Sequence, residues 1–188
     1  NNDDLNYYLD LGALIKKESF VIRGAGVKIK KIKLNKKNPK IVTVALLARM
    51  IKDKGINEFV EAVKKIKGKN IKARFLLVGD IDPLNPSSLR KQTLINWNKE
   101  GIIEWLGWVD DVDQILGETD IMCLPSYREG LPKALLEAAS YGLPIVTTDT
   151  VGCRDVVMDG VNGYLVPIKN SDELVKKISK LIKNKKLR

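Results

Sequence analysis

Apolar and polar residues alternate in blocks along the chain from about residue 40 onward, and the blocks predict strands and helices in turn. Short, nearly continuous apolar runs are typical of strands buried on both faces, as in a parallel sheet. Apolar residues at helical spacing separate these runs, for example at Phe59, Val63 and Ile66. The expected strands are 41–46, 73–78, 102–107, 120–125, 144–148 and 163–167.

Local start and stop signals accompany the predicted helices. Ser and Asp side chains can cap helix starts, and glycine is common just beyond helix ends. The expected helices run from Ile56 to Gly68, from Ser87 or Ser88 to Lys99, from Asp110 or Asp111 over a short stretch, from Lys133 to Tyr141 with Gly142 closing it, and from Ser171 onward. Six strands alternating with helices predict an α/β fold, a Rossmann-like parallel six-stranded sheet with helices on both faces.

The first 38 residues differ from the rest of the chain. Residues 2–17 predict a weak helix or turn, and residues 19–23 a short strand-like piece. Residues 28–40 are dense in Lys and poor in core candidates, which is a linker composition. We therefore predict that residues 1–38 lie outside the main domain and that residues 39–188 form it.

The absence of His excludes several kinds of site. It removes His-containing metal sites, Ser-His and Cys-His catalysis, and any His general base. Cys123 and Cys153 match no zinc-binding spacing, and Cys123 lies in an apolar run, so we expect a reduced core cysteine, which suits the cytoplasm. No apolar run reaches the roughly 18 residues of a membrane-spanning helix.

The net charge of +10 has three interpretations. It could serve a nucleic acid, an anionic membrane surface, or only the solvation of faces rich in Lys. No basic motif interleaved with aromatic residues supports nucleic acid, and we expect no such partner. The Lys-rich face of the last predicted helix, within residues 176–186, would suit anionic lipid, which implies a cytoplasmic protein in peripheral contact with the inner membrane.

The loop after the first predicted strand carries Arg49 and Lys54 just before a helix start. Ligands of parallel α/β sheets bind beyond the carboxyl ends of the strands. A guanidinium fork and an ammonium together suit a diphosphate, and the helix N-terminus adds N–H groups and a favourable dipole. The alternative is that both residues are solvated loop cations.

The loop after the fourth predicted strand contains a second candidate group. Gly130 permits close approach of the backbone to a ligand, and Pro132 suits a first helical turn. The N–H groups of Gly130 and Leu131 could then point at a phosphate, with Glu129 beside the site. Glu137 lies on a small, apolar helix face and needs a partner, for which ribose or sugar hydroxyls are suitable. The alternative is a helix-start cap with one salt-bridged Glu.

Glu129 and Glu137 are spaced as in the E-x7-E motif of retaining glycosyltransferases. Together with Arg49, Lys54-Gly55, Gly79 and the glycines of 152–163, they make the chain resemble glycosyltransferase family 4 over about residues 20–188. The segments 79–83 and 124–133 look most like bacterial enzymes that assemble capsule, O-antigen or lipid-linked oligosaccharides.

The resemblance implies a role for each candidate residue. Arg49 and Lys54 would neutralise the diphosphate and its leaving-group charge. Glu129 would contact hydroxyls of the donor sugar, and Glu137 would hold the ribose. The remaining donor-binding residues would be Gly107, Trp108 and Val109 around the base, and Gly130, Leu131, Pro132 and Lys133 around the phosphates and sugar.

The resemblance also implies a larger architecture. The GT-B fold has two Rossmann-like domains, and the chain would supply the donor-binding half, with residues 1–38 as the tail of the N-terminal acceptor domain and the linker. Family members transfer a sugar, here a hexosyl or N-acetylhexosaminyl group, with retention of configuration. The expected donor is a UDP-sugar and the expected acceptor a glycan or lipid-linked glycan of surface polysaccharide biosynthesis. No metal or other cofactor is expected, and this fragment alone should bind donor without transferring sugar.

Two other protein classes share the predicted fold. A nicotinamide oxidoreductase should show G-x-G-x-x-G after the first strand, where this chain has Leu47-Ala48-Arg49-Met50. A non-catalytic module that binds nucleotide-sugars or serves in assembly would keep the fold without needing both Glu129 and Glu137. This second class remains the alternative to the enzyme.

Overall fold

Six parallel strands form one sheet in the order β3-β2-β1-β4-β5-β6. The computed structural model describes residues 1–22, 24, 26–29 and 41–188. The strands are β1 (Thr43–Leu47), β2 (Arg74–Val78), β3 (Glu104–Trp105), β4 (Ile121–Leu124), β5 (Ile145–Thr148) and β6 (Gly163–Val166). The helices are α1 (Asn2–Asp10), α2 (Ile56–Gly68), α3 (Lys91–Lys99), α4 (Val112–Glu118), α5 (Lys133–Ser140) and α6 (Ser171–Lys183), with short 3-10 turns η1 (Lys16–Glu18), η2 (Lys52–Lys54) and η3 (Lys185–Leu187). The predicted Rossmann-like sheet is confirmed.

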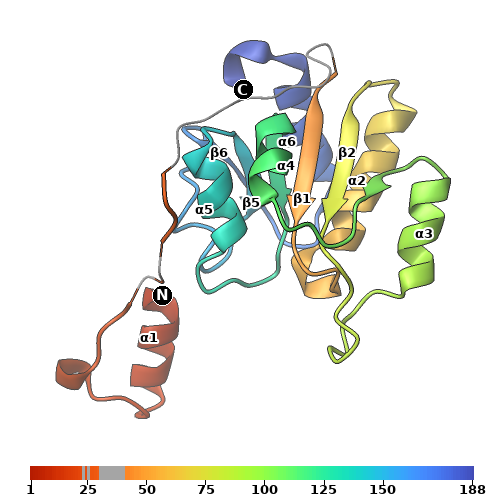
Figure 1. Cartoon of the computed structure of the whole chain (residues 1–188). Coiled ribbons are helices and arrows are strands. Elements are labelled where there is room, and N and C mark those ends of the chain that lie inside the picture. Colours follow the sequence, from red (N-terminus) through yellow and green to blue (C-terminus); the bar gives the residue numbers. More distant parts are fainter. Residues whose placement is uncertain (23, 25, 30–40) are drawn as a thin grey trace.

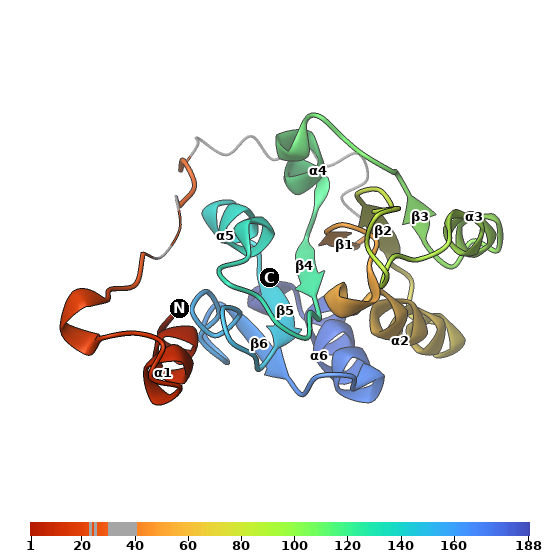
Figure 2. The same cartoon turned by 90° about the horizontal axis from the view of Figure 1, so that it is seen from below.

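Helices cover both faces of the sheet (Figure 1). Seen along the strands, α4 and α5 lie on one face, α2 and α6 lie on the other, and α3 lies beside the edge strand β3 (Figure 2). All residues of β1 and β4 are buried, which explains their continuous apolar runs. On the inner side of α2, Phe59 packs edge-to-face against Phe75 of β2 with ring centroids 6.3 Å apart. Burying each such side chain contributes roughly 1.5–3 kcal/mol.

The start of α3 differs from the prediction. Arg90 occupies the N-cap position, and neither Ser87 nor Ser88 caps the helix. The Ser87 hydroxyl donates to Asp53 Oδ2 at 2.8 Å, and the Ser88 hydroxyl accepts from the N–H of Asp82 at 3.1 Å. Both hydroxyls therefore tie neighbouring loops together, so they are not available to the helix.

The starts of α4 and α6 test the same kind of prediction. Asp111 caps α4 as one of the two expected residues, and its side chain accepts from the N–H of Gln114. In α6 the prediction is wrong by one position, because Asn170 caps the helix by accepting from the N–H of Glu173, and Ser171 is the first helical residue. Both side chains satisfy an N–H that has no partner inside the helix.

Of two predicted strands, one is shorter than expected and the other is absent from the described residues. The third strand has only two residues, Glu104–Trp105, and it lies at the edge of the sheet. Residues 19–22 form no strand, and the end of that predicted piece, Arg23, lies outside the described residues. Most of the predicted linker, together with the domain boundary at residue 38, also lies outside them, so these expectations remain predictions.

Cys123 and Cys153 are both buried free thiols, as predicted for Cys123. Burial raises the pKa of the Cys123 thiol above its ordinary value. Within the described part of the chain, no group of His, Cys, Asp and Glu side chains could hold a metal ion. In the same residues, no helix is both long enough and apolar enough to cross a membrane.

Candidate functional site

The strand order places a topological switch point between β1 and β4. From β1 the sheet continues to β2 on one side and to β4 on the other, and the loops that follow β1 and β4 lead to α2 and α5 on opposite faces of the sheet (Figure 2). Crevices of this kind are where α/β sheets bind ligands. The two loops are joined directly, because the N–H of Tyr127 donates to the carbonyl of Asp53 at 2.8 Å.

Gly55 makes the close approach of these loops possible. It has a φ of +70°, and an added Cβ would lie 2.1 Å from the carbonyl oxygen of Pro125. Only a residue without a side chain fits such a position. The backbone that carries Lys54 is therefore pressed against the end of β4, next to the loop that carries Glu129.

Lys54 and Glu129 form a largely buried ion pair at this junction. Lys54 Nζ lies 2.6 Å from Glu129 Oε1, and the two side chains are 20% and 10% exposed. The Ser126 hydroxyl donates to the same carboxylate oxygen at 2.6 Å. Two donors, one of them charged, thus hold a carboxylate that has little contact with water.

The backbone around Glu129 is fixed by the loop after β5. The N–H of Glu129 donates to the carbonyl of Val151 at 3.3 Å. Gly152 has a φ of +79°, and a Cβ there would lie 2.4 Å from the carbonyl oxygens of both Glu129 and Gly130. Within the described part of the chain, the N–H groups of Gly130 and Leu131 donate no hydrogen bond. These groups precede α5 and are available to an anion.

A cavity of about 830 Å3 opens at the carboxyl edge of the sheet. Five of the residues predicted from sequence line it: Arg49, Trp108, Val109, Lys133 and Glu137. The rest of the lining is Leu47, Ala48, Val78, Gly79, Asp80, Ile81, Asp82, Pro83, Asp110, Val112 and Ala134. The volume is in the range of small-molecule sites.

The other predicted residues lie outside this lining. Lys54 and Glu129 form the ion pair at the loop junction, and Gly130 and Leu131 are in the loop next to it. Gly107 accepts a hydrogen bond from the N–H of Gly79 at 2.7 Å, which joins the loops after β2 and β3. Pro132 is at the N-cap position of α5 instead of in its first turn.

Each candidate cation of the site is held by a carboxylate. Arg49 pairs with Asp82 at 2.6 Å, and Lys133 pairs with Glu137 at 3.2 Å, one turn along α5. Both cations are well exposed, so each pair contributes at most about 1 kcal/mol. A polyanion entering the cavity could therefore draw these cations away from their carboxylates.

Two residues of this arrangement, Asp82 and Ser126, were not predicted from the sequence. Asp82 is the partner of Arg49, and Ser126 is the second donor to Glu129. Both follow the carboxyl ends of strands, so their position in the loops after β2 and β4 was a signal available from the strand prediction. Trp108 is 74% exposed, and its indole N–H donates to Asp110 at 3.1 Å.

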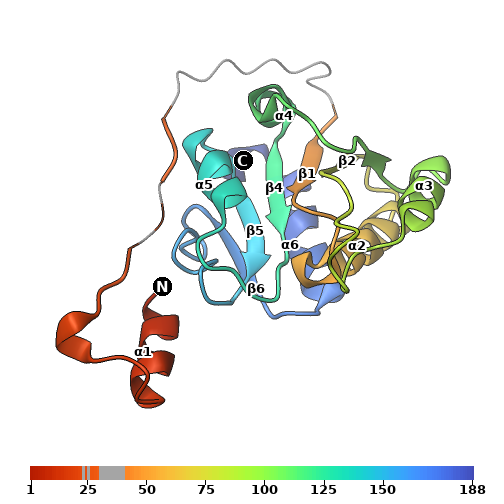
Figure 3. The ribbon, with the colours of Figure 1, turned by 60° about the horizontal axis from the view of Figure 1, so that its bottom comes forward.

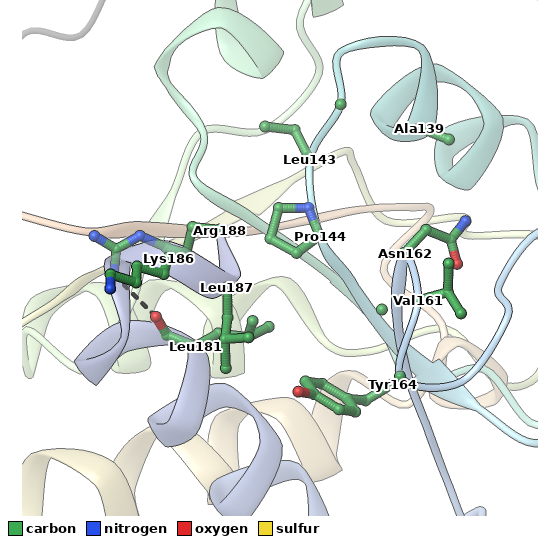
Figure 4. A pocket seen from close by; sticks show the side chains of 13 residues that line it. Ala139, Leu143, Pro144, Val161, Asn162, Tyr164, Leu181, Lys186, Leu187 and Arg188 are labelled. Atoms are coloured by element: carbon green, nitrogen blue, oxygen red, sulfur yellow. Dashed lines mark hydrogen bonds between the residues drawn. The ribbon is translucent and has the colours of Figure 1, made fainter.

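A second cavity, of about 400 Å3, lies at the opposite end of the sheet, near the C-terminal residues (Figure 4). Arg188 donates to the carbonyls of Leu181 and Ile182 at 2.9 and 2.6 Å, which closes the end of α6. Pro144 and Tyr164 lie on the other side of the cavity (Figure 4). None of the residues predicted for the donor site lines it.

Comparison with known proteins gives consistent matches. A family model described as glycosyl transferases group 1 matches residues 38–184. The chain is 33% identical over 201 residues to the N,N'-diacetylbacillosaminyl-diphospho-undecaprenol alpha-1,3-N-acetylgalactosaminyltransferase of Campylobacter jejuni, covering 100% of the chain and 51% of that protein. It is 31% identical over 144 residues to the UDP-Gal:alpha-D-GlcNAc-diphosphoundecaprenol alpha-1,3-galactosyltransferase of Escherichia coli, covering 76% of the chain and 37% of that protein.

The fold is also found among solved structures. A mutant of TarM from S. aureus, in complex with fondaparinux, alpha-GlcNAc-glycerol and UDP, superposes with a TM-score of 0.79 at 22% identity. The match covers 95% of this chain and 36% of TarM. The chain thus spans between about a third and half of the length of these proteins.

Proposed function

Because the chain belongs to the group 1 glycosyl transferase family, we propose that it is the donor-binding half of a retaining glycosyltransferase. Its donor would be a UDP-sugar, and its product a glycan or lipid-linked glycan of a bacterial surface polysaccharide. The observation that carries this proposal is the Lys54–Glu129 ion pair, held at 2.6 Å at the switch point of the sheet. The loop that carries Lys54 also carries Arg49, and the loop that carries Glu129 leads to Lys133 and Glu137; these three residues line the cavity at the same edge of the sheet.

The geometry supports separate roles for the cations and for the glutamates of the site. The diphosphate would lie between Arg49, Lys54 and the free N–H groups that precede α5, where positive charge and backbone donors converge. Transfer breaks the bond between the anomeric carbon of the sugar and the diphosphate oxygen, and UDP keeps the electron pair. A hydroxyl oxygen of the acceptor forms the new bond to the anomeric carbon, and its proton passes to the departing diphosphate. The two cations would stabilise that charge as it develops, without a metal ion or other cofactor.

The two glutamates would hold the two sugars of the donor. Glu137 borders the cavity and could accept from the ribose hydroxyls once Lys133 releases it. Glu129 would accept from hydroxyls of the transferred sugar, and binding of the diphosphate by Lys54 would free one of its oxygens. Trp108 and Val109 would border the base from the loop after β3.

The relatives favour the nucleotide and the acceptor class. The names of the C. jejuni and E. coli proteins specify acceptors linked to undecaprenol by a diphosphate, and the E. coli name also specifies a UDP-sugar. The TarM structure holds UDP. We extend these properties to this chain as part of the proposal, with the acceptor bound by the N-terminal domain of the complete protein.

The location of the protein is part of the same proposal. A cytoplasmic enzyme with a lipid-linked acceptor would work at the inner membrane. Lys176, Lys180 and Lys183 are exposed on one face of α6 and offer a surface for anionic lipid, where each would contribute about 1 kcal/mol.

Calorimetric titration of the chain with UDP at low salt tests the proposal. We expect saturable binding that weakens about tenfold in Arg49→Ala and in Glu137→Ala, because each removes a charged hydrogen-bonding group from the site. Lys183→Ala, which removes a cation from α6, is the matched control and should bind as the unchanged chain does. Absence of binding to UDP, GDP and ADP at millimolar concentration would refute donor binding by this chain.

A transfer assay separates the enzyme from the non-catalytic alternative. The complete protein should transfer sugar from a UDP-sugar to a polyprenyl-diphosphate glycan, and Glu129→Gln should abolish transfer while UDP still binds. The 188-residue chain should bind the donor without transferring the sugar. Donor binding by a complete protein that transfers nothing would favour the non-catalytic module.

A further inference from the structure

The first turn of α1 contacts two loops of the candidate site. Asp3 pairs with Arg154 at 3.1 Å, and Asp4 pairs with Arg128. The Asn1 amide donates to the carbonyl of Gly130 at 3.4 Å. The N-terminal end of α1 is the part that faces the sheet domain, while the rest of the helix extends away from it (Figure 3).

Charge, not apolar packing, holds α1 in this position. The helix has no buried residue, and Tyr7, Tyr8 and Leu11 are all at least 48% exposed. The hydrogen bond from Arg128 lowers the pKa of Asp4 below its ordinary range, so Asp4 is charged at neutral pH. Arg154 also pairs with Asp149 at 3.2 Å, which orients it from its own loop.

These contacts converge on Glu129. Arg128 and Gly130 are its two chain neighbours, and both contact the first turn of α1. Arg154 belongs to the loop whose residues Val151 and Gly152 fix the backbone of Glu129 from the other side. Asp3 and Asp4 in the first turn of α1 therefore bridge the loop after β4, which carries Glu129, and the loop after β5, which fixes its backbone.

We propose that Asn1, Asp3 and Asp4 are positioning residues for the donor sugar, acting through Arg128, Gly130 and Arg154 on the loop that carries Glu129. The inference rests on the proposed function, in which Glu129 contacts the transferred sugar. It predicts that loss of Asp3 and Asp4 weakens recognition of the sugar more than recognition of UDP, because UDP is also held by Arg49 and Glu137, whose ion-pair partners Asp82 and Lys133 are not part of α1.

A double-mutant cycle tests this inference with changes that replace charged side chains by neutral polar ones. One variant carries Asp3→Asn with Asp4→Asn, a second carries Arg128→Gln with Arg154→Gln, and a third combines all four. Asp10→Asn, at the far end of α1, is the control for loss of an acidic charge from the helix. If the two groups act through each other, the combined variant should resemble either double variant instead of showing the sum of their effects.

The first readout is amide hydrogen exchange of residues 127–131 in the unliganded chain. We expect faster exchange in the double variants and in the unchanged chain at high salt, where exposed ion pairs weaken, and no change in Asp10→Asn. Unchanged exchange in Asp3→Asn with Asp4→Asn would overturn the inference. This readout needs no donor, so it stands even if the chain binds no nucleotide and the proposed function fails.

The second readout is the ratio of the affinities for UDP-sugar and for UDP. It should fall about threefold to tenfold in the double variants, the range expected for two exposed ion pairs, because the affinity for UDP-sugar falls more than the affinity for UDP. An equal loss of both affinities, or a constant ratio despite faster exchange, would overturn the positioning role.

Discussion

Replacing Lys54 by Met should lower the free energy of unfolding by about 2 kcal/mol. Removing one partner of a fully buried ion pair costs about 3–5 kcal/mol, whereas an exposed pair contributes at most about 1 kcal/mol. The pair with Glu129 lies nearer the buried limit, with side chains 20% and 10% exposed. The Ser126 hydroxyl remains as a donor to the carboxylate in the variant and reduces the loss. For a domain of this size the melting temperature should fall by roughly 4–8 °C.

Urea unfolding followed by tryptophan fluorescence measures this change. The cycle consists of Lys54→Met, Glu129→Gln and the two combined, and it should show a coupling energy of at least about 1 kcal/mol, because each single variant leaves a charge without its partner. Lys52→Met, an exposed neighbour in the same turn, is the control and should change stability by less than about 0.5 kcal/mol. Additive effects in the cycle, or a loss in Lys54→Met no larger than in Lys52→Met, would refute the reasoning.

Two further predictions concern backbone strain and thiol reactivity. Gly152→Ala should destabilise the chain by more than about 2 kcal/mol, because its Cβ would collide with two carbonyl oxygens. Gly160 has a similar φ but open space around it, so Gly160→Ala should cost only about 1 kcal/mol. Equal losses of stability for the two variants in urea unfolding would contradict this prediction. Cys123 and Cys153 are 0% exposed, and burial raises the pKa of the Cys123 thiol, so neither should react with an aromatic disulfide reagent at neutral pH until the chain unfolds. Rapid reaction of the native chain would show that the core is open.

The elements that were predictable from sequence are those whose burial leaves a periodic pattern. β1 and β4 are buried on both faces, so their apolar runs are continuous and their positions are close to those expected. The length of the strand at Glu104–Trp105 was overestimated because Ile102 and Ile103, which precede it, pack against the core without joining the ladder. Caps depend on competing polar partners, and the hydroxyl of Ser87, for example, is bound to another loop.

The candidate site was predictable as a set of residues but not as a set of contacts. The positions of Arg49 and Lys54 after a strand indicated a phosphate site. The pairing of Lys54 with Glu129 joins residues 75 positions apart, and no local pattern specifies such a contact. Asp82 is similar, because only the three-dimensional structure brings it to Arg49.

The central place of β1 in the sheet has a consequence for the order of folding. β1 can pair early with β2, the next strand along the chain, but its other neighbour is β4, and the contact of Thr43 with Asp120 closes a loop of 77 residues. Long loops form slowly because chain entropy opposes them. The two sequential halves, β1 to β3 and β4 to β6, would therefore form before they dock. Because Lys54 comes from one half and Glu129 from the other, their ion pair would report the completion of folding.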